Sequence, residues 1–291
     1  MLRFYLQYEF FDEYMSFYLD EESTYINEFS NYLRFTGLSF DYSSKNTFLS
    51  FEGITNLTPD LNSYLSIVQE DGGADISFPK VVPKRAAIVT SLSLIDFSKF
   101  YDEIETIMNN EEQIGYQERV HKIESFLKIS LKDDFISWIG EEVCFVQTQP
   151  IGLGEQNEYA LFLKANDIEV ATDRLNFIGN QIKKRTPVKF KGVDYVGHEI
   201  KFLSVKGLFK VLMGSFFGKI DKPYYTVIDD YVVFSNHPQT LKNIINDFEK
   251  GEVLDKSDDY KTFEKNLNQK SSFLIYVNTP IAQSSLETML L

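Results

Sequence analysis

Few of the residue types that carry catalysis occur in this chain of 291 residues. Its three histidines, His121, His198 and His237, stand far apart, and none has the second histidine four residues away that a zinc-protease helix requires. The one cysteine, Cys144, lies in a predicted strand, where a buried and inert thiol is expected. A single cysteine also excludes an intrachain disulfide and a zinc site built from several cysteines. These residues predict no catalytic or metal site.

Glycine-rich and acidic motifs predict no cofactor site either. Gly152-Leu153-Gly154 lacks the third glycine of a dinucleotide-binding loop, and the chain contains no Gly-Lys-Ser/Thr phosphate loop and no Gly-x-Ser-x-Gly hydrolase motif. Paired acidic residues occur at 133–134, 229–230 and 258–259. Neighbouring side chains on a turn or strand point apart, so we interpret these pairs as two helix starts and a hairpin turn. We expect no bound cofactor.

Residues 206–219 have the composition of a contact surface, because they combine lysines, large apolar side chains and three glycines. Such a stretch can lie on an anionic membrane or bind an amphipathic partner. The alternative is an ordinary short helix with its apolar side in the core. The candidate contact residues are Lys206, Leu208, Phe209, Lys210, Leu212, Met213, Phe216 and Phe217.

Charge is unevenly distributed along an acidic chain with a net charge of −14. This balance weighs against a nucleic-acid partner, which requires positive charge against phosphate. Residues 1–80 hold four basic and 13 acidic residues, whereas residues 183–222 hold ten basic and three acidic ones. The basic segment could complement the chain itself, a neighbouring copy or an anionic surface.

Aromatic residues are abundant, with 26 Phe, 17 Tyr and 1 Trp. Many rings indicate either large buried areas or an apolar face kept for a partner. Two clusters stand out, an acidic one at residues 4–18 and a basic one at residues 202–217. The rings of the first recur at intervals of three and four, which predicts a helix within residues 1–28.

One pattern recurs four times: an apolar β-rich run, a small polar residue, and then a helical pattern. An Asn, Asp or Thr at the junction can accept a hydrogen bond from the first helical turn, and Pro fits the first helical position. The four units are 86–92 into 95–108, 159–165 into 168–183, 231–235 into 239–248, and 272–277 into 281–290.

Hairpins and further helices lie between these units. Hairpins are predicted at 31–37 with 46–54, at 190–196 with 200–205 and at 224–228 with 231–235, and a helical region within 111–138 precedes a strand at 143–147. We therefore predict an α+β fold of mainly antiparallel sheets with helices packed on one face.

The polar, Gly- and Pro-containing stretch 69–83 is the best candidate for a domain boundary. We place an N-terminal helix and hairpin in residues 1–75, which could be the tail of a preceding domain, and an α+β domain in residues 76–291. No stretch approaches the roughly 18 apolar residues of a membrane span. Residues 1–4 do not begin a signal peptide. The chain is therefore either cytoplasmic or a piece of a longer exported protein.

Three segments resemble the bacterial domain-of-unknown-function family 3352: residues 134–142, residues 224–236, and residues 260–267 leading to 274–278. The resemblance covers about residues 75–280. It implies an exported or membrane-tethered protein of the bacterial cell envelope, often longer than this chain, and no catalytic residues, because the family has no assigned activity.

We therefore expect a non-enzymatic binding or scaffold module with a protein or hydrophobic-ligand partner. Two alternatives stay open: a carrier of a lipid or other hydrophobic ligand, and a hydrolase whose site assembles from distant residues. The sequence leaves the oligomeric state undetermined.

Overall fold

The computed structural model describes residues 2–16, 33–42, 49–57, 64–110, 114–149, 158–187, 192–203, 205, 207–213 and 218–282. The chain divides into two compact units, Met1–Glu70 and Asp71–Leu291. The boundary expected from the sequence, between residues 75 and 76, lies close to this division. Each unit is described by itself.

The first unit is built on a three-stranded antiparallel sheet in the order β1-β2-β3. Its described elements are β1 (Leu2–Gln7), α1 (Phe11–Ser16), β2 (Leu33–Tyr42), β3 (Leu49–Leu57) and α3 (Tyr64–Asp71). A helix was predicted within residues 1–28. For the beginning of this range the prediction is wrong, because Leu2–Gln7 is a strand that pairs with β2 from Leu2↔Phe40 to Gln7↔Phe35. A run of aromatic and large apolar residues favours a strand, and pairing with β2 outweighs the helical spacing.

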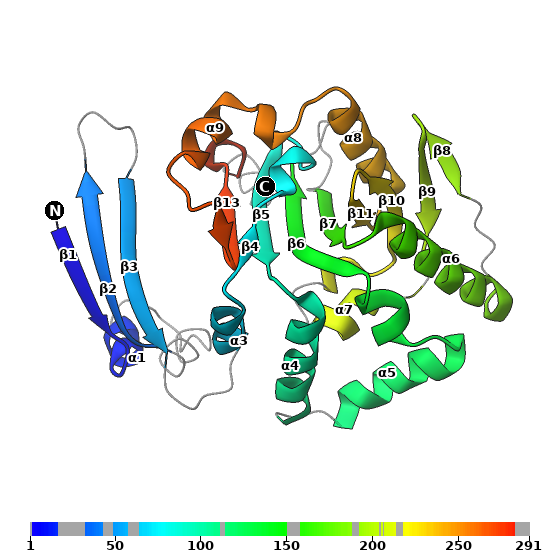
Figure 1. Ribbon diagram of the computed structural model, residues 1–291, viewed down its shortest axis with the longest axis horizontal. Helices are drawn as coiled ribbons and strands as arrows, with labels where there is room; N and C mark the ends of the chain where they lie inside the picture. Colours follow the sequence, from blue (N-terminus) through cyan, green and yellow to red (C-terminus); the bar gives the residue numbers. More distant parts are fainter. Residues whose placement is uncertain are drawn as a thin grey trace. The chain divides into compact units, whose positions relative to one another are not determined.

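The second unit contains an eight-stranded sheet in the order β13-β5-β6-β7-β11-β10-β9-β8 (Figure 1). Every neighbouring pair in this sheet is antiparallel. A two-stranded ladder, β4 with β12, lies beside it. The bounds are β4 (Ala74–Asp75), β5 (Ala86–Ser93), β6 (Ile139–Thr148), β7 (Glu158–Ala165), β8 (Val193–Tyr195), β9 (His198–Phe202), β10 (Tyr224–Ile228), β11 (Tyr231–Ser235), β12 (Lys270–Ser271) and β13 (Phe273–Val277).

The described helices of this unit are α4 (Phe97–Asn110), α5 (Ile114–Leu127), α6 (Ile168–Arg185), α7 (Leu208–Met213), α8 (Pro238–Glu249) and α9 (Asp258–Glu264). A π-helical turn spans Lys132–Ile136, and 3₁₀ turns span Phe78–Lys80 and Leu254–Lys256. The predicted α+β class is confirmed. No helix of the described ranges is long and apolar enough to cross a membrane.

The strand–cap–helix units follow the sequence pattern closely. The Asp167 carboxylate accepts hydrogen bonds from the backbone N–H groups of Glu169 and Val170, at 2.9 and 3.1 Å, and so starts α6. Pro238 begins α8, as the pattern predicted, but the N-cap residue there is His237, which makes no side-chain cap hydrogen bond. In the fourth unit, β13 leads into helical residues 279–282, and the rest of the expected helix lies outside the described residues.

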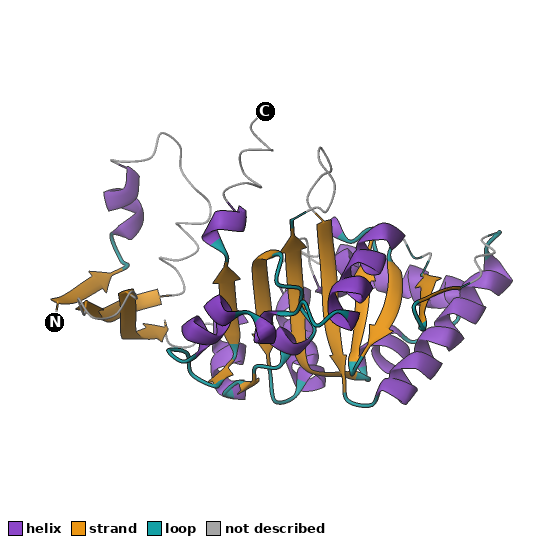
Figure 2. Cartoon of the chain, turned by 90° about the horizontal axis from the view of Figure 1, so that it is seen from above, coloured by secondary structure: helices purple, strands orange, loops and turns teal. Residues whose placement is uncertain are grey.

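Helices cover both faces of the sheet, where the sequence had led us to expect one (Figure 2). In β11, Val233 lies in a buried cluster with Ile244 of α8. Its neighbour Phe234 points to the opposite face, where its ring contacts those of Phe209 and Phe135, with centroids 4.9 and 6.1 Å apart. Consecutive apolar residues in a strand indicate burial on both faces, so the sequence of β11 already contained evidence that both faces of the sheet are covered.

A partly buried ion network joins the residue before β5 to β7 and α8. The Arg85 guanidinium donates to Glu158 through Nη1 and to Asp247 through Nε, each at 2.7 Å. Glu158 also accepts from Asn243 of α8 at 2.8 Å. Burial raises the pKa of the Asp247 carboxyl, and Arg85 opposes that rise. The network therefore fixes where α8 lies against the two strands.

We predict that Arg85→Met lowers the free energy of unfolding at pH 7 by about 3 kcal/mol, because it leaves two carboxylates without their cation. The loss should shrink as the pH falls. In the Arg85→Met variant, the folded protein takes up a proton on Asp247 at a higher pH than the unfolded chain does. The free energy of unfolding of the variant therefore falls as the pH rises through the interval between these two pKa values.

Urea unfolding between pH 5 and 8 provides the measurement, and Lys84→Met is the control. Lys84 forms an exposed ion pair with Glu252 at 3.1 Å, and its replacement should cost less than about 1 kcal/mol. Equal losses in the two variants, or a loss in Arg85→Met that does not vary with pH, would contradict the prediction.

Candidate functional site

The structure places part of the predicted contact segment in the core. Leu208 and Phe209 of α7 are 1% and 0% exposed. The Phe209 ring packs edge-on against Phe135, with centroids 5.7 Å apart. Burial therefore favours the ordinary-helix alternative for these two side chains, whereas Lys210 is exposed. Lys206, Phe216, Phe217 and the side chains of Leu212 and Met213 lie outside what the structure describes.

The sequence-selected nucleophile and bases do not come together. Cys144 is buried in β6, as its strand position predicted, and burial raises the pKa of its thiol. His121 is exposed on α5, and His237 is exposed where α8 begins. His198 begins β9, where its ring nitrogens lie 2.7 Å from the Val227 carbonyl oxygen and 2.9 Å from a Glu249 carboxylate oxygen.

The carboxylate of Glu142 in β6 is fully buried. Its two oxygens accept from the Ser77 N–H and hydroxyl, both at 3.0 Å, and from the Ser93 hydroxyl at 3.3 Å. The Tyr231 hydroxyl donates a short hydrogen bond to it. Burial and the adjacent Glu142 charge raise the pKa of Tyr231, so this hydroxyl keeps its proton.

The Glu142 cluster holds the segment before β5 against the sheet. Ser77 precedes the 3₁₀ turn Phe78–Lys80, and its hydroxyl lies 2.6 Å from the Tyr231 hydroxyl. Since every donor aims at one enclosed carboxylate and no solvent reaches it, the arrangement suits structural fixation more than turnover. Sequence reasoning missed Glu142; the only signal was Glu141-Glu142 within a strand, where alternation sends one of the two side chains inward.

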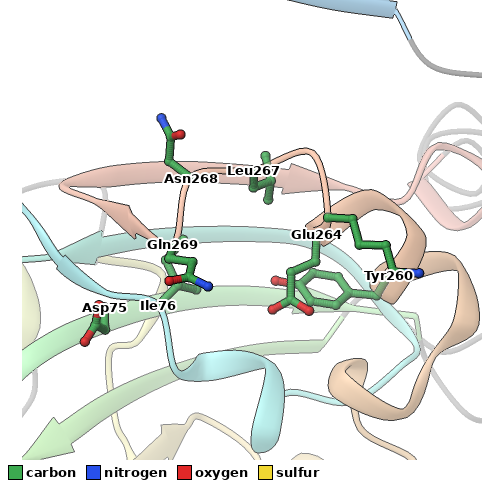
Figure 3. Close-up of a pocket in the computed structure, with 8 residues that line it drawn as sticks. Asp75, Ile76, Tyr260, Glu264, Leu267, Asn268 and Gln269 are labelled. Carbon is green, nitrogen blue, oxygen red and sulfur yellow. The ribbon is translucent and has the colours of Figure 1, made fainter. Parts of the chain in front are cut away.

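A polar hollow of about 560 Å³ lies near this cluster, between α9 and the β4–β12 ladder (Figure 3). Tyr260 is 1% exposed. Figure 3 shows this hydroxyl and the Glu264 carboxylate facing the hollow. Burial, reinforced by the Glu264 charge, raises the pKa of Tyr260. The remaining lining residues are Asp75, Ile76, Lys265, Leu267, Asn268 and Gln269.

The last strand of the sheet exposes an apolar stripe, which we call the β13 edge: Phe273, Ile275 and Val277. These side chains are 54%, 56% and 45% exposed. Within the described ranges, β13 pairs only with β5, so its other edge has no strand partner there. The strand carries no charge, no proline and no bulge, which are the usual protections of a free edge.

The opposite edge strand, β8, differs in length and in charge. It has only three residues, and one of them is Asp194. Its Val193 is 50% exposed, much as Val277 is in β13. A short, charged edge is a poor template for another strand, whereas five uncharged residues are a good one. The two ends of one sheet therefore offer very different surfaces to a partner.

Sequence reasoning assigned β13 correctly as a strand but missed its exposure. The run Phe273–Val277 consists entirely of apolar or aromatic residues, which is also typical of a strand buried on both faces. Only the strand order places it at the edge, where α9 covers one face through Tyr276 and Phe263, with ring centroids 5.9 Å apart. The other face carries the stripe.

We predict that Glu142→Ala lowers the free energy of unfolding by about 3 kcal/mol, because it leaves the Ser77, Ser93 and Tyr231 donors buried without an acceptor. Tyr231→Phe, which removes one donor to a charged group, should cost about 2 kcal/mol.

The matched control is Glu141→Ala. Its side chain is half exposed and 3.9 Å from Lys164, so its removal should cost less than about 1 kcal/mol. Urea unfolding of the three variants at pH 7 measures the differences. A cost at Glu141 equal to that at Glu142 would show that burial of the carboxylate does not matter.

Comparison with known proteins gives one match. A family model described as "Protein of unknown function (DUF3352)" matches residues 61–290. Searches of curated proteins and of solved structures find no match to the chain.

Proposed function

The chain belongs to the DUF3352 family of proteins of unknown function, and from the surface of its sheet we propose that it is a non-enzymatic binding or scaffold module. The observation that carries this proposal is the β13 edge, an uncharged strand with three large apolar side chains exposed at the end of the sheet. The bacterial cell envelope is the location we propose, on the strength of the family resemblance alone.

The partner we propose is an extended polypeptide segment that adds to the sheet as a ninth strand beside β13. Backbone N–H and C=O groups of an edge strand supply affinity in this mode, and side-chain contacts on the two faces supply selectivity. The stripe continues onto β5, where Ile88 and Leu92 are partly exposed and face the same side. A segment with apolar residues at alternate positions would cover this surface.

The arrangement of titratable groups supports a binding role over hydrolysis. Both ring nitrogens of His198 are engaged, and the Glu142 carboxylate is enclosed. The lipid-carrier alternative needs an enclosed cavity lined by Phe and Leu. The hollow beside Tyr260 has charged and amide side chains in its lining and no Phe, and so does not favour that alternative.

We predict that Ile275→Lys and Val277→Lys abolish partner binding without unfolding the protein, because a charge on the stripe opposes burial by another strand. Val193→Lys on β8 is the matched control, an equally exposed valine on the other edge, and should bind normally. Random peptides displayed on phage provide the ligands, selected on the wild-type chain and then compared across the three variants. Thermal unfolding of each variant checks its fold.

Hydrogen exchange should then show slower exchange of backbone amides in residues 273–277 when a selected peptide is bound. If selected peptides bind all three variants equally, or protect amides elsewhere and not in β13, the proposed binding surface is wrong. Loss of binding in Val193→Lys alone would move the surface to the other edge.

A further inference from the structure

The pairing of β13 with β5 determines which backbone groups β13 presents at its free edge. The Ser93 N–H donates to the Ser272 carbonyl, and the Asn278 N–H donates to the Ala87 carbonyl, each at 2.9 Å. Both bonds continue the register of the two strands. Residues that bond to a given neighbour alternate along an antiparallel strand. The N–H and C=O groups of the odd-numbered residues within Phe273–Val277 therefore point away from β5, toward the free edge.

The residues whose backbone groups face the free edge are also the residues of the apolar stripe. Phe273, Ile275 and Val277 each combine an outward N–H and C=O with an exposed apolar side chain. The Phe273 carbonyl accepts from the Ser271 hydroxyl at 2.8 Å, and its second lone pair leaves room for an added strand. An occupant that matches this edge needs apolar side chains at every second position, all on one face.

β13 itself has the features that this edge requires of an occupant. Antiparallel pairing of two copies, centred on Ile275, places Ile275 opposite Ile275 of the second copy. In the same register Phe273 lies opposite Val277 of the second copy. Opposed residues of an antiparallel pair lie on the same face, and pairs of aromatic with β-branched side chains stabilise a sheet. The two stripes would therefore join into one apolar surface.

The charges near β13 permit this self-pairing. Lys270 is the one charged residue in the sequence 270–280, and in this register it lies opposite Pro280 of the second copy. The two lysines are thus at opposite ends of the paired strands. β8 shows the contrary case, because its central residue is Asp194, and self-pairing about it would set two aspartates face to face. Like charges directly opposite each other destabilise a strand pair.

Self-pairing of β13 also closes the assembly. A two-fold axis uses the same edge of both copies, so the joined sheet would end on β8 at each side. That strand has three residues and carries Asp194, which makes it a poor template for a further strand. The expected product is a dimer and not an open fibre.

We propose that the β13 edge is a homodimer interface, in which β13 of a second copy is the added strand. This inference rests on the strand-addition surface proposed above and names its occupant. Each of the three opposed residue pairs would exchange both of its N–H···O=C bonds. The stripes of the two copies would pack side by side across the axis.

Sedimentation velocity of the full chain, from about 1 μM to about 100 μM, tests the proposal over the range in which a small interface assembles. We expect a species of twice the chain's mass at the upper end. Ile275→Lys sets two lysines opposite each other at the axis and should raise the dimer Kd by about tenfold or more. Val193→Lys, at a similarly exposed valine on β8, is the matched control and should leave Kd unchanged. Thermal unfolding checks that each variant folds.

A charge exchange tests the register. Ile275→Glu alone should weaken the dimer as Ile275→Lys does, because like charges again meet at the axis. An equimolar mixture of the two variants should form a heterodimer, since glutamate then lies opposite lysine. This rescue requires residue 275 to face residue 275 of the other chain, so its absence would overturn the proposed two-fold pairing.

Hydrogen exchange resolved to single amides adds a second readout. Dimer formation should slow exchange at Phe273, Ile275 and Val277 and change Leu274 and Tyr276 less, because the last two already face β5. A peptide that was selected for the β13 edge should dissociate the dimer, since both occupy one edge. A peptide that protects these amides and leaves the dimer intact would overturn the proposal.

Two further outcomes would overturn it. A wild-type chain that stays monomeric at about 100 μM has no such interface. If selected peptides still protect residues 273–277 of that monomer, strand addition stands and only the second copy is wrong as the occupant; if they do not, both proposals are wrong. A dimer that persists in Ile275→Lys would place the interface elsewhere, for example at the hollow of about 620 Å³ between α6 and strands β9 and β10.

Discussion

Burial of the central strands on both faces is the constraint on which the second unit depends. In β11, alternate side chains pack under α8 on one side and against Phe135 and Phe209 on the other. Such a strand can lie only in the middle of a sheet with helices on both faces. It therefore fixes where the covering helices lie, and it leaves the outermost strands as the places where the sheet can meet a partner.

Two polar networks at this apolar interior hold covering segments in place. Glu142 gathers donors from the segment before β5 and from β11, and Arg85 joins two strands to the end of α8. A buried carboxylate is tolerated because each oxygen is hydrogen-bonded. These networks specify one packing of helices on strands, and with it the shape of the surfaces between them.

The surfaces that we consider for binding lie where this packing ends. At β13 the side chains of one face are about half exposed, so a strand with a core-like sequence presents an apolar stripe. Between α6 and β10 the layers separate enough to leave a hollow, with Tyr225 in its lining and acidic residues at its rim. One surface is uncharged and the other is negatively charged, so they suit chemically different partners.

Local features of this protein could be predicted from the sequence, because their causes are local. The Asp167 cap and the 224–228 with 231–235 hairpin depend on neighbouring residues only, and the structure confirms both. The beginning of the chain was predicted wrongly as a helix, because its pairing with β2 is set some 30 residues away. Strand order, the exposure of β13 and the burial of Glu142 were decided by tertiary structure alone. Each depends on pairings between distant segments, whose free energies no local pattern contains.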